Sequence, residues 1–141
     1  MRRFQFCALL LVAGMSVSAC GNAHGSSDEA NVGSASISTS SWKPGDPGAD
    51  ALIRGTLRFT RGGCPTFGAN RGVDWPADYT SVVKPNGERV VRTADGRDIA
   101  AGDTVVAGGG FSGPARSGMP CIRPGSSVAY IESEVRIIRS R

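Results

Sequence analysis

A strict alternation of apolar and polar side chains over residues 53–59 restricts the fold of this chain more than any other sequence feature. One side of the segment is apolar and the other is polar, with Ile53, Leu57 and Phe59 on the first and Arg54, Thr56 and Arg58 on the second. A period of two is typical of a β-strand that buries one face. The segment therefore predicts a strand that covers a core.

Short β-prone runs continue to the end of the chain, at residues 80–83, 88–93, 104–107, 128–131 and 135–138. Turn residues separate these runs, and the dipeptide Asn86-Gly87 is a strong hairpin signal because both residue types tolerate a positive φ. Six or so short strands without helical periodicity predict an all-β domain over residues 50–141. We expect a small closed or partly open β-barrel, since closure removes exposed strand edges, with an open sandwich as the alternative. The barrel is OB-like, of the oligonucleotide/oligosaccharide-binding type, by analogy alone.

The N-terminus has the proportions of a secretory signal. Arg2 and Arg3 precede an apolar stretch over residues 4–17, which is short for a membrane-spanning helix of about 20 apolar residues. The stretch ends in Val17-Ser18-Ala19-Cys20, which resembles, at each of its four positions, the lipobox of bacterial lipoprotein precursors.

This resemblance implies that a peptidase removes residues 1–19 and that Cys20 becomes a lipid-modified N-terminus. Two acyl chains on one residue anchor stably, because each buried methylene adds about 0.8 kcal/mol. We therefore expect a protein held by lipid on the extracytoplasmic face of the cell membrane. The alternative is an ordinary signal peptide whose removal leaves a free cysteine.

Residues 20–49 are rich in Ser and Gly and offer little to bury, so they predict a flexible tether ahead of the domain. The charge of the mature chain is nearly balanced. Without Arg2 and Arg3, the chain has 14 basic and 12 acidic residues, a formal charge of +2, and the basic residues do not form a run. Proteins that bind nucleic acid usually carry a concentrated basic stripe, so we expect no nucleic-acid partner.

Two cysteines remain in the domain once Cys20 is assigned to the lipid. Cys64 and Cys121 both lie among loop-forming residues, and an even pair in an exported domain predicts a disulfide. The alternative is a redox or metal pair, which would require a C-x-x-C spacing or a nearby histidine. The chain has one histidine, His24, and it lies in the tether. We therefore expect neither a metal site nor a cofactor.

Three patterns resemble catalytic or ligand-binding motifs. Ser81 and Lys84 have the S-x-x-K spacing of penicillin-recognising enzymes, but that motif requires a helix, and here it lies in a β-type run. Asp74 and Asp78 flank an aromatic residue, as the paired carboxylates of a glycosidase can. A third group has the composition of a calcium loop but not its spacing, and consists of Asp95, Asp98 and Asp103.

The glycine-rich segment 108–118 predicts a mobile loop. Gly108-Gly109-Gly110 lacks the Gly-Lys-Ser/Thr that completes a phosphate-binding loop. Its neighbours Phe111, Arg116 and Met119 are our candidates for a contact surface.

Several short segments follow one another in residues 51–141, namely Gly62-Gly63-Cys64-Pro65, Trp75-Pro76, Gly102-Asp103-x-Val105, Gly108-Gly109-Gly110 and Cys121. In this order they resemble small uncharacterised lipoproteins of high-GC Gram-positive bacteria. The resemblance implies no activity. We expect a noncatalytic module of the cell envelope that binds a protein, a wall polymer or a small ligand. The alternative is a small envelope enzyme that uses loop carboxylates near Asp74 and Asp78.

Overall fold

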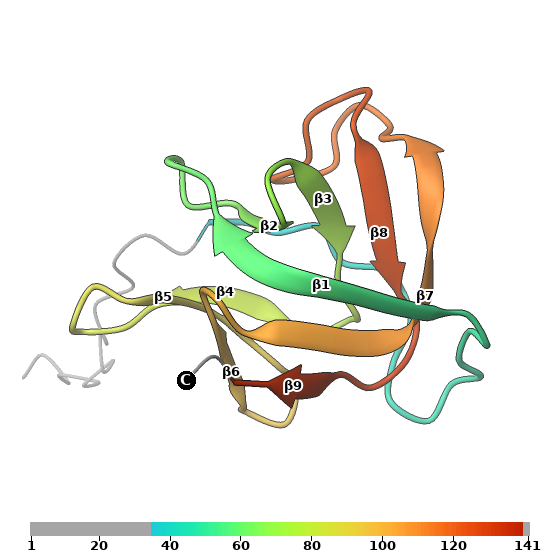
Figure 1. The fold of residues 1–141 in the computed structure, drawn as a ribbon, viewed down its shortest axis with the longest axis horizontal. Coiled ribbons are helices and arrows are strands. Elements are labelled where there is room, and N and C mark those ends of the chain that lie inside the picture. Colours follow the sequence, from blue (N-terminus) through green and yellow to red (C-terminus); the bar gives the residue numbers. More distant parts are fainter. Residues whose placement is uncertain (1–34, 140–141) are drawn as a thin grey trace, which may run out of the picture.

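The computed structural model of the chain describes residues 35–139. The predicted signal peptide, the predicted lipidation site Cys20 and the first part of the predicted tether therefore lie outside the described residues. The described part is all-β and contains nine strands and no helix. This confirms the predicted fold class (Figure 1).

Five strands close into a barrel. They are β1 (Leu52–Phe59), β2 (Pro65–Phe67), β3 (Arg71–Asp74), β8 (Ser127–Ile131) and β7 (Thr104–Pro114). Each strand pairs with the next in this order, and β7 pairs with the first half of β1 to complete the ring. The pairing of β3 with β8 is parallel, whereas all the others are antiparallel.

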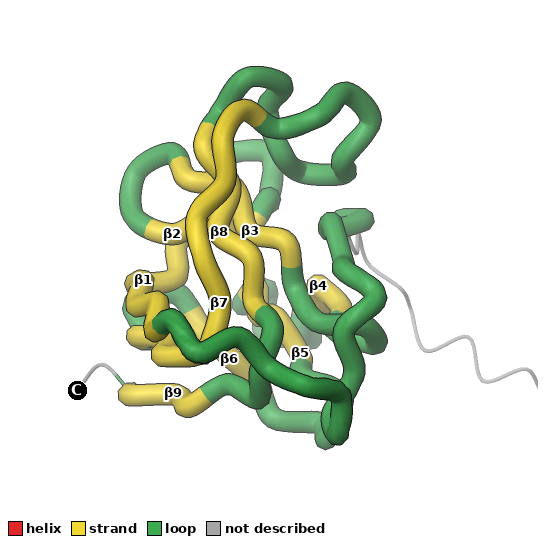
Figure 2. The backbone as a smooth tube through the Cα atoms, turned by 90° about the vertical axis from the view of Figure 1, so that its right-hand side faces the viewer, coloured by secondary structure: helices red, strands yellow, loops and turns green. Residues whose placement is uncertain are grey.

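The remaining strands extend the barrel. β4 (Thr80–Val83), β5 (Arg89–Arg92) and β6 (Asp98–Ala100) form a separate three-stranded antiparallel sheet. β9 (Arg136–Ile138) pairs with the first residues of β7, on the edge opposite β1. Figure 2 shows β7, β8 and β3 side by side, with long loops beyond their upper ends.

The core lies inside the barrel and beneath the small sheet. Trp75 is fully buried, makes an edge contact with Phe67 at 5.7 Å and stacks on Tyr79 at 6.1 Å. Burial raises the pKa of the Tyr79 hydroxyl to about 12. The predicted alternation on β1 is confirmed, because Ile53 and Leu57 are buried while its arginines are exposed.

The prediction of a mobile loop over residues 108–118 is wrong for its first half. Residues 108–114 belong to β7, which is the longest strand of the barrel. The glycines permit close backbone approach. A Cβ atom at Gly109 would lie 1.9 Å from the Tyr130 carbonyl oxygen, and one at Gly108 would lie 2.5 Å from the Ala49 carbonyl oxygen.

The sequence pattern also missed β2 and β3. Both strands are short, and Gly, Pro and Asn residues surround them. Their β-conformation comes from pairing with strands that are distant in sequence, and local propensity does not report such pairing.

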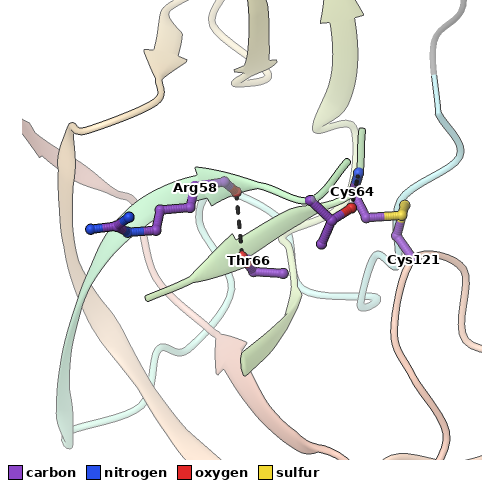
Figure 3. Close-up of a disulfide and its surroundings, with 5 residues drawn as sticks. Arg58, Cys64, Thr66 and Cys121 are labelled. Carbon is purple, nitrogen blue, oxygen red and sulfur yellow. Dashed lines mark hydrogen bonds between the residues drawn. A yellow bond between two sulfur atoms is a disulfide. The ribbon is translucent and has the colours of Figure 1, made fainter. Parts of the chain in front are cut away.

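The predicted disulfide is confirmed. Cys64 and Cys121 are bonded, with their Cα atoms 5.2 Å apart, and the bridge joins the β1–β2 loop to the β7–β8 loop (Figure 3). Beside the bridge, the Thr66 hydroxyl donates a hydrogen bond to the Arg58 carbonyl oxygen across the β1–β2 pair.

We predict that Gly109→Ala destabilises the barrel by about 2–3 kcal/mol, because its methyl group overlaps a backbone atom that cannot move away independently. Gly110→Ala is the matched control, since a Cβ atom there has no neighbour within 4 Å. Urea unfolding of both variants checks this. Equal stabilities would contradict the close approach of β7 to β8.

We predict that Cys64→Ala/Cys121→Ala lowers the free energy of unfolding by about 4 kcal/mol, because the bridge closes a loop of 57 residues in the unfolded chain. The melting temperature should fall by at least about 10 °C, as followed by circular dichroism. Adding a reductant should have the same effect on the unsubstituted protein and no effect on the double variant. An unchanged melting temperature in reductant would mean that the bridge contributes nothing.

Candidate functional site

A broad hollow lies over the outer face of β3 and β8. It has a volume of about 980 Å³ and is open to solvent. Three parts of the chain line it: the segment 36–39, the outward side chains of β3 and β8, and residues 112–120 at the end of β7 and in the following loop.

The floor of the hollow consists of Asp74 and Tyr130. These residues are direct partners in the parallel β3–β8 register, so their side chains leave the barrel on the same face. Asp74 is only 8% exposed, and its carboxylate accepts a hydrogen bond of 2.7 Å from the Ser38 hydroxyl. Tyr130 is half-buried and adds an aromatic ring and a hydroxyl to the lining.

One wall is the segment that precedes the barrel. In this segment, Thr39 forms a parallel β-bridge with Trp75. The Ser40 N–H donates a hydrogen bond of 2.7 Å to the Trp75 carbonyl oxygen, and the Trp75 N–H donates one of 3.0 Å to the Ser38 carbonyl oxygen. Further along, Ala77 N–H donates to the Trp42 carbonyl at 2.8 Å. The sequence predicts a flexible tether through residue 49. Its described part instead packs on the barrel, because β3 ends with free backbone groups that this segment satisfies.

The opposite wall is the β7–β8 loop, which contributes Arg116 and Met119. The loop is held at two points. The Cys64–Cys121 bridge ties it to the β1–β2 loop, and Ile122 packs on the outer face of β3 at Gly72, where a Cβ atom would lie 2.7 Å from the Ile122 side chain. A second hollow of about 490 Å³ lies on the bridge side of this loop, lined in part by Cys121 and Gly72.

The three predicted contact residues are not brought together. Arg116 and Met119 line the hollow, whereas Phe111 does not. Phe111 is 53% exposed, and the Arg71 guanidinium lies over its ring at 4.4 Å. The structure therefore divides the predicted surface into a loop wall and a separate cation–π pair at the start of β3.

The S-x-x-K pair is engaged in structural contacts. Ser81 is buried in β4, while Lys84 forms ion pairs of 3.2 Å with Glu88 and Asp98. Hydrogen bonds to these two carboxylates, of which the bond to Glu88 has the larger effect, raise the pKa of Lys84 above its ordinary value, so the amine is held in its protonated form. A protonated amine cannot act as the base that such an enzyme needs.

The acidic residues also take structural roles. Asp98 pairs with Arg92 at 2.9 Å, which lowers the pKa of its carboxyl group, and Asp103 receives a hydrogen bond from Arg139 at 2.8 Å. Asp95 bonds to Arg97 and Thr93. Within residues 35–139, no three His, Cys, Asp or Glu side chains are grouped so that they could hold a metal ion.

Asp74 and Asp78 differ in their environments. Asp74 is buried in the floor of the hollow, whereas Asp78 is exposed, has a φ of 66° and is not among the lining residues. The hollow thus combines one carboxylate, one guanidinium, an aromatic hydroxyl and several serine and threonine hydroxyls. Such a lining can hold a polar ligand by multiple hydrogen bonds. Sequence reasoning missed Ser38 and Tyr130, because only the tertiary fold brings them to Asp74.

No protein-family model, no curated protein and no solved structure matches this chain. In the described residues, no helix has the length and apolar character needed to cross a membrane.

Proposed function

We propose that the protein is a lipid-anchored binding module on the extracytoplasmic face of the cell membrane, and that the hollow over β3 and β8 takes a polar segment of a cell-wall polymer. The anchor is Cys20 in its lipobox-like sequence. The observation that carries the binding role is the hollow itself, because two walls distant in sequence are fastened around a buried carboxylate.

The lining favours a ligand with hydroxyl and amide groups. Hydroxyl groups are the most frequent polar groups around the hollow, supplied by Ser36, Ser38, Thr39, Ser112, Ser117 and Tyr130. Asp74 can accept hydrogen bonds from ligand hydroxyls, while the Arg116 guanidinium can donate to a carboxylate or a carbonyl oxygen. Glycan and peptide segments of a wall polymer offer these groups along one chain.

One wall of the hollow corresponds to a binding loop of OB-type barrels. In those barrels, ligands bind across the second and third strands and beside the loops that follow the first and fourth strands. Here the β7–β8 loop follows the fourth barrel strand and lines the hollow, whereas the β1–β2 loop does not, and the hollow lies over β3 and β8 rather than over β2 and β3. This likeness concerns architecture alone, so the proposal depends on the residues that line the hollow.

A binding role accounts for the lining better than glycoside hydrolysis does. Hydrolysis of a glycosidic bond commonly requires two carboxyl groups that flank the scissile bond. Asp74 is the single acidic residue among those that line the hollow, and Asp78 lies outside that set.

We predict that Cys20→Ala moves the protein from the membrane fraction to the soluble fraction, because the thiol that would carry the acyl chains is lost. Immunoblotting of fractionated cells checks this, with Cys7→Ala as the matched control, since Cys7 lies within the predicted signal peptide. Retention of the Cys20→Ala form in the membrane would contradict lipid anchoring.

We predict that Asp74→Asn/Arg116→Gln weakens binding of soluble wall fragments, released by a glycan-cleaving hydrolase, at least tenfold. Each change removes one charged hydrogen-bonding group from the hollow. Isothermal titration of the chain from residue 20 onward, carrying Cys20→Ala, measures the affinities. Asp78→Asn is the matched control and should bind as the parent does. A melting curve of each variant separates lost binding from lost folding. Equal binding by all three proteins would exclude the hollow as the site.

A further inference from the structure

A second surface of the barrel, the basic face, consists of the outward side chains of β1, β7 and β9, and its charged residues are all arginines. The outward positions of β1, β7 and β9 form rows across the three strands, and the register places Arg54, Val106 and Arg136 in one row. The next row contains Thr56, Thr104 and Ile138. Leu52 and Arg58 continue the outward face of β1 in both directions.

None of the outward residues of these three strands is acidic. Arg54, Arg58 and Arg136 are all exposed, and none has a carboxylate partner among residues 35–139. Among the other exposed arginines, Arg97 and Arg139 have such partners, which are Asp95 and Asp103. The exposed arginines without a carboxylate partner elsewhere lie outside these three strands and are Arg61, Arg71, Arg116 and Arg123. The three unpaired guanidinium groups therefore give this face a local excess of positive charge.

Exposed apolar side chains lie among these arginines. Leu52 is 75% exposed and Ile138 is 42% exposed, and these two are among the few large apolar side chains that the described surface displays. Val106, which lies between Arg54 and Arg136 in the register, is buried. One guanidinium group can donate two parallel hydrogen bonds to a phosphate group. Leucine and isoleucine side chains can enter the boundary between lipid headgroups and acyl chains.

We infer that the outward face of β1, β7 and β9 docks on an anionic phospholipid surface. The arginines would bind lipid phosphates while Leu52 and Ile138 enter the headgroup boundary. A soluble polyanion would offer the same phosphate chemistry but nothing for the two apolar side chains, so the lipid surface is the better fit. This docking does not depend on the acyl anchor or on the ligand of the hollow.

The anchor is compatible with this orientation. About 15 residues separate Cys20 from Ala35, and an extended chain of that length spans at most about 50 Å. A domain of this size is roughly 30–35 Å across. A lipid on Cys20 therefore leaves the domain free to turn either side to the bilayer, and the basic face determines which side does so.

The test uses the chain from residue 20 onward with Cys20→Ala, which contains every described residue and carries no lipid. Its partitioning onto vesicles of phosphatidylglycerol and phosphatidylcholine is compared with that onto phosphatidylcholine alone. Arg54→Gln/Arg58→Gln/Arg136→Gln should lower partitioning onto the anionic vesicles about 100-fold, since each basic side chain near such a surface contributes about fivefold. The matched control, Arg61→Gln/Arg71→Gln/Arg123→Gln, removes the same charge elsewhere and should bind within about threefold of the parent.

A second variant distinguishes the two sources of phosphate. Leu52→Ser/Ile138→Ser should lower vesicle binding about tenfold and leave binding to inorganic polyphosphate unchanged. Equal losses in the two arginine variants would overturn the inference, because net charge alone would then explain binding. Vesicle binding unaffected by the serine changes would also overturn it and would identify a site for soluble polyanions. Neither result bears on the hollow, whose ligand is titrated without lipid.

Discussion

The structure depends on the pairing of β1 with two different partners. Its first half pairs with β7 and its last residues pair with β2, and this double pairing turns an open sheet into a closed ring. Closure brings parts of the strand backbones so close to neighbouring groups that no side chain fits between them. At Gly55 a Cβ atom would lie 2.3 Å from the Phe67 ring, so this position must remain glycine for Phe67 to reach the core. Without the closed ring, the buried faces of five short strands would have no common interior to fill.

Closure also determines where binding surfaces can form. A barrel of this size has its interior filled by side chains, with Leu57, Val105 and Ile131 fully buried, so a ligand must be held outside it. The β7–β8 loop forms such an outside surface because it is attached to the barrel at both Cys121 and Ile122. A loop held at two points loses little conformational entropy when a ligand binds, and this favours affinity.

The sequence is most informative where local chemistry determines structure. The alternation on β1, the Asn86-Gly87 hairpin and the cysteine pair each depend on residues close in sequence or on a simple count, and the structure confirms all three. The candidate site depends on distant contacts instead. Ser38 reaches Asp74 over 36 positions, and nothing in the Ser- and Gly-rich segment around Ser38 distinguishes it from its neighbours. The glycines at 108–110 predict a mobile loop wrongly because their role, close approach to β8 and Ala49, depends on strands that local sequence does not reveal.

The long strand β7 belongs to both proposed surfaces, and its length keeps them apart. Its residues 104–106 lie on the basic face, while residues 112–114 line the hollow. Pro114 lies eight positions beyond Val106 in the strand, a distance of about 25 Å. Electrostatic interactions through solvent are screened within about 8–10 Å at physiological ionic strength, so lipid phosphates on one surface would hardly affect the charge of Asp74 or Arg116 on the other. With the basic face on the bilayer, the hollow would remain open to the envelope, and both contacts could form on one molecule without competing.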